Sequence, residues 1–185
     1  MRWFWIDKFL EFESGRYAVA VKNVSLAEDH LHEHFPGAPV MPSSLVVEGL
    51  AQTGGLLVGE YNQFRRRVVL AKVSSVRFYF QATPGDTLTY RTDIRDIKEH
   101  GAIVHGTSHV GERLQAETDI FFAHLPEGAS GRALFDAHTF LNWLRILGMD
   151  QVGRRADGSK IELPPAPFQE SYEYNPNPNP TGLAG

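Results

Sequence analysis

The sequence predicts an α+β fold in which a long central helix is wrapped by an antiparallel β-sheet. Residues 43–61 have the apolar character of a buried helix, yet they contain four glycines. Segments rich in β-branched and aromatic residues follow this helix, with turn residues between them. Seven of the 11 prolines lie after residue 125. We therefore expect one domain over residues 1–125 and an extension over residues 126–185.

The first expected strand covers residues 17–24, where valine and alanine predominate. The helix is expected from Ser43 to about Tyr61. Each of its four glycines costs about 1 kcal/mol relative to alanine in a helix interior. Close approach of the surrounding sheet to the helix backbone would offset this cost, because glycine has no Cβ to hold the two surfaces apart.

Four strands are expected after the helix, over residues 68–80, 88–94, 102–110 and 114–122. The segments 83–86 and 111–112 have the composition of turns. We expect these strands to form an antiparallel meander.

The extension contains one amphipathic helix at about residues 134–149, with Asp136 as its N-cap and Gly148 as its stop. We expect this helix to pack on the main domain or on a partner subunit. Prolines recur over residues 164–180, where they remove backbone donors and disfavour helix. That segment is expected to be an extended, disordered tail.

Charge and composition exclude several classes of protein. The chain carries 18 Lys and Arg against 22 Asp and Glu, a net charge of −4, and so lacks the positive field that binds nucleic acid or anionic membranes. It has no cysteine, which removes thiolate nucleophiles and sulfur-based zinc sites. No apolar segment reaches the roughly 18 residues of a membrane helix. We expect a cytoplasmic protein that binds neither nucleic acid nor membrane.

Glu48 is the strongest chemical anomaly, because it places a carboxylate inside the apolar segment 45–51. Burying an ionised carboxylate without a partner is costly. One interpretation is structural, with the carboxylate held by backbone groups or by Gln52, one helical turn further. The other is functional, with Glu48 as an acid that protonates a leaving group in a dry pocket.

The loop before the helix, residues 34–43, contains three prolines and one glycine, and it delivers His34 to the helix start. Unpaired N–H groups at a helix N-terminus can stabilise an oxygen that becomes negative during a reaction. A histidine base, such a donor and the acid Glu48 together form a complete set for proton transfer.

Residues 34–52, HFPGAPVMPSSLVVEGLAQ, resemble the signature of the hot-dog-fold (3R)-hydroxyacyl-[acyl-carrier-protein] dehydratase family, the FabZ/FabA-like enzymes of type II fatty acid synthesis. The family pattern is HFPGxPVMPG, followed by a carboxylate fourteen residues after the histidine and by a nearby AQ pair. Glu48 and Ala51-Gln52 stand at those places. Weaker similarity extends from about Trp5 through Leu125, and residues 126–185 lie outside it.

The resemblance implies dehydration of a 3-hydroxyacyl thioester to the trans-2-enoyl product, without a metal or other cofactor. The substrate would be carried on the phosphopantetheine arm of acyl carrier protein. His34 would act as base, Glu48 as acid, and the backbone N–H of Ser43 would polarise the thioester carbonyl. The residues implied to shape the site are Phe35, Pro36, Gly37, Pro42 and Gln52.

The resemblance also implies a homodimer in which histidine and carboxylate meet across the subunit interface, with further assembly into a trimer of dimers as an option. Glutamate at position 48, where related enzymes have aspartate, resembles the branch that dehydrates without isomerising the double bond.

Ser43 departs from the family pattern, which has glycine at this position. The N–H remains, but a side chain now occupies a place where backbone and substrate approach closely. A non-catalytic hot-dog protein that binds acyl thioesters or the carrier is therefore an alternative. A hot-dog thioesterase, in which the carboxylate activates water, is a third hypothesis.

Two further patterns allow both a functional and a plain interpretation. Arg65, Arg66 and Arg67 form a basic run that would steer docking of an acidic carrier protein, or would simply be a solvated loop. The second pattern is the alternation of His30, His32 and His34, which on a strand would place three metal ligands on one face. Because the following prolines predict a loop, we expect no metal site here.

Overall fold

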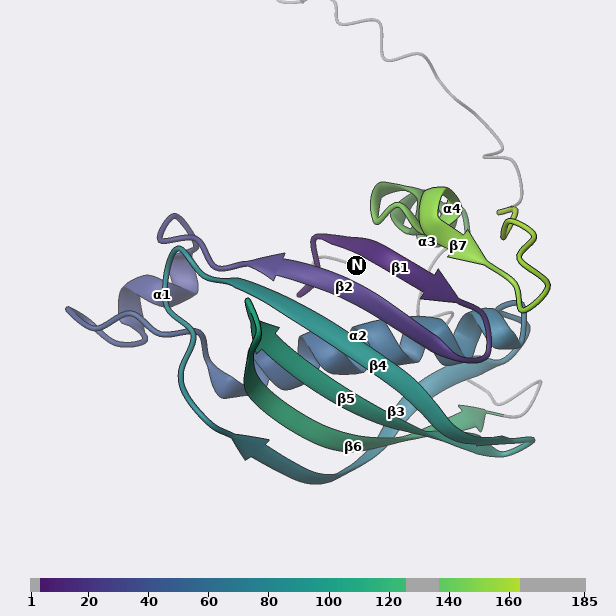
Figure 1. Ribbon diagram of the computed structural model, residues 1–185, viewed down its shortest axis with the longest axis horizontal. Coiled ribbons are helices and arrows are strands. Elements are labelled where there is room, and N and C mark those ends of the chain that lie inside the picture. The colour runs from purple at the N-terminus through teal and green to yellow at the C-terminus, as the bar shows by residue number, and fades with distance from the viewer. Residues whose placement is uncertain (1–3, 126–136, 164–185) are drawn as a thin grey trace, which may run out of the picture.

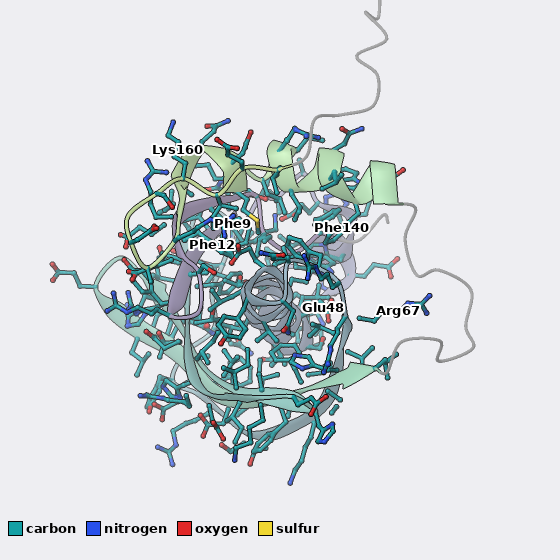
Figure 2. The ribbon with its side chains drawn as sticks, turned by 90° about the vertical axis from the view of Figure 1, so that its right-hand side faces the viewer. Phe9, Phe12, Glu48, Arg67, Phe140 and Lys160 are labelled. Atoms are coloured by element: carbon teal, nitrogen blue, oxygen red, sulfur yellow. The ribbon has the colours of Figure 1, made fainter. Side chains whose placement is uncertain are left out.

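The sheet has seven strands in the order β3-β6-β5-β4-β2-β1-β7, and it curves around the long helix α2 (Ser43–Tyr61) (Figure 1). The computed structural model describes residues 4–125 and 137–163. The strands are β1 (Lys8–Glu13), β2 (Tyr17–Asn23), β3 (Arg67–Phe78), β4 (Thr87–Lys98), β5 (Gly101–Val110), β6 (Arg113–Leu125) and β7 (Gly153–Arg154). This architecture confirms the predicted helix wrapped by a sheet, and Figure 2 shows the sheet curving around α2.

The glycines of α2 lie where the sheet approaches the helix most closely. A Cβ at Gly49 would stand 2.5 Å from the Tyr90 ring of β4, which is less than any ordinary contact. A Cβ at Gly54 would stand 3.1 Å from Val104 of β5. Tyr90 and Val104 are fully buried, so these contacts belong to the core. The predicted reason for the glycines is therefore confirmed.

The predicted meander of four strands is only partly correct. Strands β4, β5 and β6 are antiparallel neighbours in chain order. However, β3 pairs with the far side of β6 rather than with β4. The connection from β3 to β4 therefore passes across two strands, and it includes the turn at Thr83–Asp86, in which Asp86 N–H donates to Thr83 O at 3.0 Å. Alternation within a strand sets its buried face but does not choose its neighbour.

Two elements of the domain were not predicted from the sequence. Strand β1 has only two fully buried side chains, Phe9 and Phe12, and no β-branched residue. Helix α1 (Asp29–Glu33) is one turn long and buries Leu31 alone. Such short amphipathic signals are weak, because each rests on one or two apolar positions.

The described part of the extension packs against strand β1 at one end of the sheet. Helix α3 (Ala137–Ile146) is followed by α4 (Met149–Val152), with Gly148 at a left-handed φ of 74° between them. Strand β7 then pairs with β1 in parallel. The expected N-cap Asp136 and the proline-rich tail lie outside the described residues.

No helix within residues 4–125 and 137–163 has the length and apolar character needed to cross a membrane.

Candidate active site

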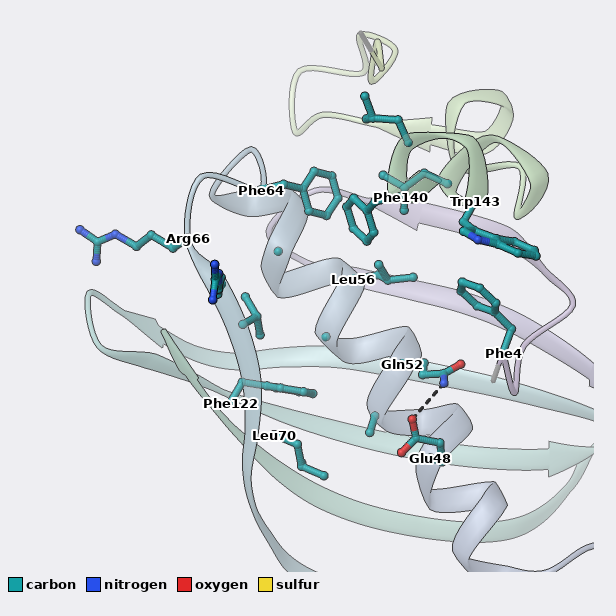
Figure 3. Close-up of a pocket in the computed structure, with 17 residues that line it drawn as sticks. Phe4, Glu48, Gln52, Leu56, Phe64, Arg66, Leu70, Phe122, Phe140 and Trp143 are labelled. Carbon is teal, nitrogen blue, oxygen red and sulfur yellow. Dashed lines mark hydrogen bonds between the residues drawn. The ribbon is translucent and has the colours of Figure 1, made fainter. Parts of the chain in front are cut away.

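Glu48 lines a cavity of about 480 Å³ beside helix α2. The side chain is half-buried. The cavity walls come from α2, from strands β3 and β6, from the N-terminal segment and from α3, and they are mostly apolar (Figure 3). The lining residues are Phe4, Glu48, Ala51, Gln52, Gly55, Leu56, Gly59, Phe64, Arg66, Arg67, Val68, Leu70, Phe122, Phe140, Leu141, Trp143 and Leu144.

The carboxylate of Glu48 is held by the neighbouring side chain on α2. Gln52 Nε2 donates to Glu48 Oε1 at 2.9 Å (Figure 3), and Gln52 Oε1 accepts from the backbone N–H of Trp5 at 2.8 Å. Because the backbone N–H can only donate, it fixes the oxygen of the amide and so turns the NH₂ group toward Glu48. The predicted structural partner of Glu48 is thus present within the cavity itself.

His34 stands at the C-terminal end of α1, on a loop that projects from one end of the molecule (Figure 1). Its ring stacks on Phe35 at a centroid distance of 4.3 Å. The loop closes through the bonds Ala38 N–H to Phe35 O at 2.9 Å and Val40 N–H to His34 O at 2.9 Å. Gly37 supplies the positive φ of 78° that this turn requires. Phe35 is 54% exposed, so the loop presents an apolar ring to the outside.

The start of α2 follows this loop directly. Pro42 is the N-cap residue, and its carbonyl accepts from Leu45 and Val46 at 2.9 and 3.2 Å. Ser43 is exposed in the first turn, where a backbone N–H has no acceptor within the helix. Met41 N–H donates to Ala82 O at 2.8 Å, which ties the loop to the segment before β4.

The structure therefore brings only part of the predicted set together within one chain. Glu48 and Gln52 share the cavity, whereas His34 and Ser43 are not among the residues that line it. The cavity does reach strand β3 through Leu70, which is 46% exposed. Strand β3 forms an edge of the sheet, and no described strand pairs with its outer side. Thus the cavity opens beside a sheet edge that is free in the single chain.

The three alternating histidines point to different neighbours. His30 packs edge-on against Trp5 at 5.0 Å, and His32 Nε2 lies 2.8 Å from the carbonyl oxygen of Leu26. Within the described residues, no group of three His, Cys, Asp or Glu side chains is placed to hold a metal ion.

The three arginines of the basic run lie in different surroundings. Arg66 Nη1 donates to the backbone oxygen of Glu99 at 2.8 Å, and both Arg66 and Arg67 line the cavity. Arg65 is exposed. Docking of a carrier protein on these residues stays a prediction.

Sequence reasoning missed several residues that line the cavity, and it missed Trp5, which does not line the cavity but holds Gln52. Trp5 acts through its backbone N–H, for which no side-chain pattern gives a signal. Phe140 and Trp143 stand on the amphipathic helix of the extension, which the sequence predicts only to pack on the main domain or on a partner subunit, yet both line the cavity. Their spacing of three residues places them on one helix face, but the sequence does not show what that face covers.

A curved antiparallel sheet around one long helix, with an acid in an apolar cavity beside that helix, defines a hot-dog-fold protein. Within this class, the chain belongs to the family of FabA-like domains, whose family model matches residues 4–117, more than half of the chain.

Curated relatives share more than a third of the aligned residues. The chain is 42% identical over 119 residues to the 3-hydroxyacyl-[acyl-carrier-protein] dehydratase FabZ of Moorella thermoacetica. The alignment covers 64% of this chain and 83% of that protein. It is 36% identical over 119 residues to the enzyme of the same name from Pelotomaculum thermopropionicum. This alignment covers 64% of this chain and 85% of that protein.

Solved structures show the same fold at low identity. A Streptococcus mutans protein bound to acetyl CoA has a TM-score of 0.56 and 16% identity, with 68% of this chain and 93% of that chain covered. The dehydratase heterocomplex ApeI:P from Xenorhabdus doucetiae has a TM-score of 0.55 and 15% identity, with 66% and 83% covered.

Proposed function

We propose that this protein is a (3R)-hydroxyacyl-[acyl-carrier-protein] dehydratase, a hydro-lyase of fatty acid or related lipid synthesis. The observation that carries the proposal is the Glu48 carboxylate, oriented by Gln52 in an apolar cavity of a FabA-like domain. The relatives named FabZ support the same activity. The substrate arrives on the phosphopantetheine arm of the carrier protein, and the location expected from the sequence is the cytoplasm.

The reaction divides into two proton transfers and the loss of water. His34 removes a proton from the carbon next to the thioester carbonyl, and Glu48 donates a proton to the departing 3-hydroxyl group. The electron pair of the broken C–H bond forms the new double bond as water leaves. The backbone N–H of Ser43, at the positive end of the α2 dipole, stabilises the negative charge that develops on the thioester oxygen. No step requires a metal or a nucleotide.

We further propose that two copies of the chain form the working unit. Glu48 lines the cavity and His34 is not among its lining residues, so in this arrangement a second copy supplies the histidine. Strand β3 supports this arrangement, because a long edge strand with unpaired backbone groups is a template for pairing with another chain. Its exposed residues include the apolar Leu70, Val76 and Phe78, at 46%, 37% and 36% exposure, beside the charged Lys72 and Arg77. Large apolar side chains exposed along an unpaired edge support pairing with a second copy.

The serine at position 43 favours one alternative, a hot-dog protein that binds the carrier-bound thioester without turning it over. The Ser43 side chain is exposed at the start of α2, in the position proposed for the thioester carbonyl. In that case a Ser43→Gly change would create activity rather than preserve it.

The deciding experiment incubates the protein with a trans-2-enoyl and a 3-hydroxyacyl carrier-protein thioester. Enoyl absorbance and free thiol are followed together, and Glu48→Gln is the control. We expect interconversion of the two thioesters, with a loss of roughly 10² to 10⁴ in the control, the range for a positioned acid or base. Thiol release without an enoyl product would instead indicate a thioesterase. Binding of the carrier with neither signal would favour the non-catalytic alternative.

A further inference from the structure

We propose that helix α3 closes one end of the cavity beside Glu48 and thereby limits the length of the acyl chain that the enzyme accepts. This inference rests on the proposed dehydratase function. Helix α3 lies beyond residue 117, where the family match ends, yet it contributes to the same cavity as Glu48 (Figure 3). Its four lining residues are Phe140, Leu141, Trp143 and Leu144.

The cavity follows α2 from Glu48 to Gly59. At a rise of 1.5 Å per residue, these two positions lie about 16 Å apart along the helix. Glu48 and Gln52 make one end polar, while Leu56 and Phe64 line the cavity further toward Gly59. An apolar wall of this length suits an alkyl chain, because the transfer of each methylene group out of water is favourable.

A series of ring contacts lines the far end of the cavity, near Gly59. Phe64 packs against Gly59, where an added Cβ would stand 3.0 Å from the Phe64 ring. The ring of Phe140 then meets Phe64 edge-on at a centroid distance of 5.1 Å. On the adjacent side, Trp143 packs on Phe4 at 4.5 Å. Phe140 and Trp143 of α3 thus form cavity walls together with Phe64 and with Phe4 of the N-terminal segment.

Helix α3 is fixed firmly enough to act as a wall. Leu144 and the following Leu147 are 1% and 2% exposed, and both belong to the core. The carbonyl of Leu147 accepts a hydrogen bond of 2.8 Å from the Phe9 N–H of β1. Strand β7 adds a parallel pairing to the same strand. A ligand that reached α3 would therefore contact side chains that are held in place by the core and by strand β1.

The cavity end near Gly59 also contains Arg66 and Arg67. If the carrier protein docked on these arginines, its phosphopantetheine arm would occupy this part of the cavity and the acyl chain would lie elsewhere. The two arrangements differ in what α3 controls. With the acyl chain against α3, changes in α3 alter the preference among chain lengths. With the arm against α3, they alter all chain lengths equally.

The test compares kcat/KM for crotonyl, octenoyl and hexadecenoyl thioesters of the carrier protein in wild-type enzyme and in Phe140→Ala. We expect the ratio of the longest to the shortest substrate to rise by about tenfold or more, since each methylene admitted is worth about fourfold. Ile146→Ala is the matched control, because Ile146 stands on the same helix, is 63% exposed and does not line the cavity. Its ratio should equal that of the wild type.

A second variant, Leu141→Phe, adds volume to the same wall and should lower that ratio. It keeps the proposal testable if Phe140→Ala does not fold. An unchanged ratio in the folded variants, or an equal change for all three substrates, would overturn the inference while leaving the dehydratase activity intact. A wild-type enzyme that is inactive on every chain length would instead overturn the proposed function, and the inference with it.

Discussion

Gln52 donates a hydrogen bond of 2.9 Å from its side-chain amide to the carboxylate of Glu48, four residues earlier on the same helix. The second anchor of this amide is the backbone N–H of Trp5, at 2.8 Å. The N-terminal segment therefore helps to set the direction of the proposed catalytic acid. This makes Gln52 a positioning residue in the proposed mechanism.

Replacing Gln52 by alanine should lower kcat by about tenfold, because the hydrogen bond that orients the proposed acid is removed. KM should change little, since the carrier-bound substrate keeps its other contacts. Steady-state kinetics on one enoyl thioester checks both values. In a Glu48→Gln background the same change should have almost no further effect on kcat, since the group that Gln52 orients is already neutralised. Equal losses in both backgrounds would show that Gln52 acts only through stability.

A shared active site predicts that two inactive variants restore each other. In a mixed dimer of His34→Ala and Glu48→Gln chains, one of the two sites has an intact histidine and an intact glutamate. Random assortment should return about a quarter of wild-type activity, because half of the dimers are mixed and each has one working site. The measurement is activity after the two variants are unfolded and refolded together. No recovery, despite dimers that contain both chains, would place both residues of each site in one chain.

The contact between Gly49 and Tyr90 predicts a large effect of a single methyl group. Gly49→Ala should destabilise the protein by about 1 to 3 kcal/mol despite the better helix propensity of alanine, because the new Cβ overlaps the ring. Gly55→Ala is the matched change on the same helix, where the nearest atom is Phe122 Cε1 at 3.3 Å. Its effect should be much smaller or slightly stabilising. Chemical denaturation of both variants checks the difference, and equal effects would contradict the packing argument.

Glu60 predicts a pH dependence of stability. This residue of α2 is 4% exposed, and its burial raises the pKa of the carboxyl above the ordinary value of 4.5, while a hydrogen bond from Ser14 and the charge of Arg155 oppose the shift. A raised pKa means that the folded state binds the proton more tightly than the unfolded state does. The contribution of Glu60 to stability is therefore greatest below pH 4.5 and is lost as the pH rises through the raised pKa.

Glu60→Gln should remove this pH-dependent part. Thermal unfolding of the wild type and the variant between acidic and neutral pH gives the comparison. We expect the stability of the wild type relative to the variant to fall as the pH rises above 4.5. Parallel curves would show that Glu60 titrates alike in the folded and unfolded states.

The sequence was most informative where local chemistry fixes structure. The helix predicted at residues 43–61 is observed as Ser43–Tyr61, since its glycines and apolar residues identify a buried helix. The motif from His34 to Gln52 likewise indicated the family to which the chain belongs. By contrast, the pairing of β3 with β6 and the place of Phe140 in the cavity depend on contacts between distant segments. Periodicity shows which face of such an element is apolar, but not which segment will cover it.

The two edge strands of the sheet determine how many copies of the chain could join edge to edge. At one end, Phe9 and Ser14 of the β1 region already donate their N–H groups to Leu147 and Arg154, and β7 pairs with the end of β1. At the other end, β3 has an outer side that no described strand pairs. In the proposed dimer, pairing of β3 with β3 of a second copy would use the open edge of both chains and leave only the edges where β7 pairs with β1. In the proposed dimer, the extension would thus direct edge-to-edge association into closed pairs and away from fibres.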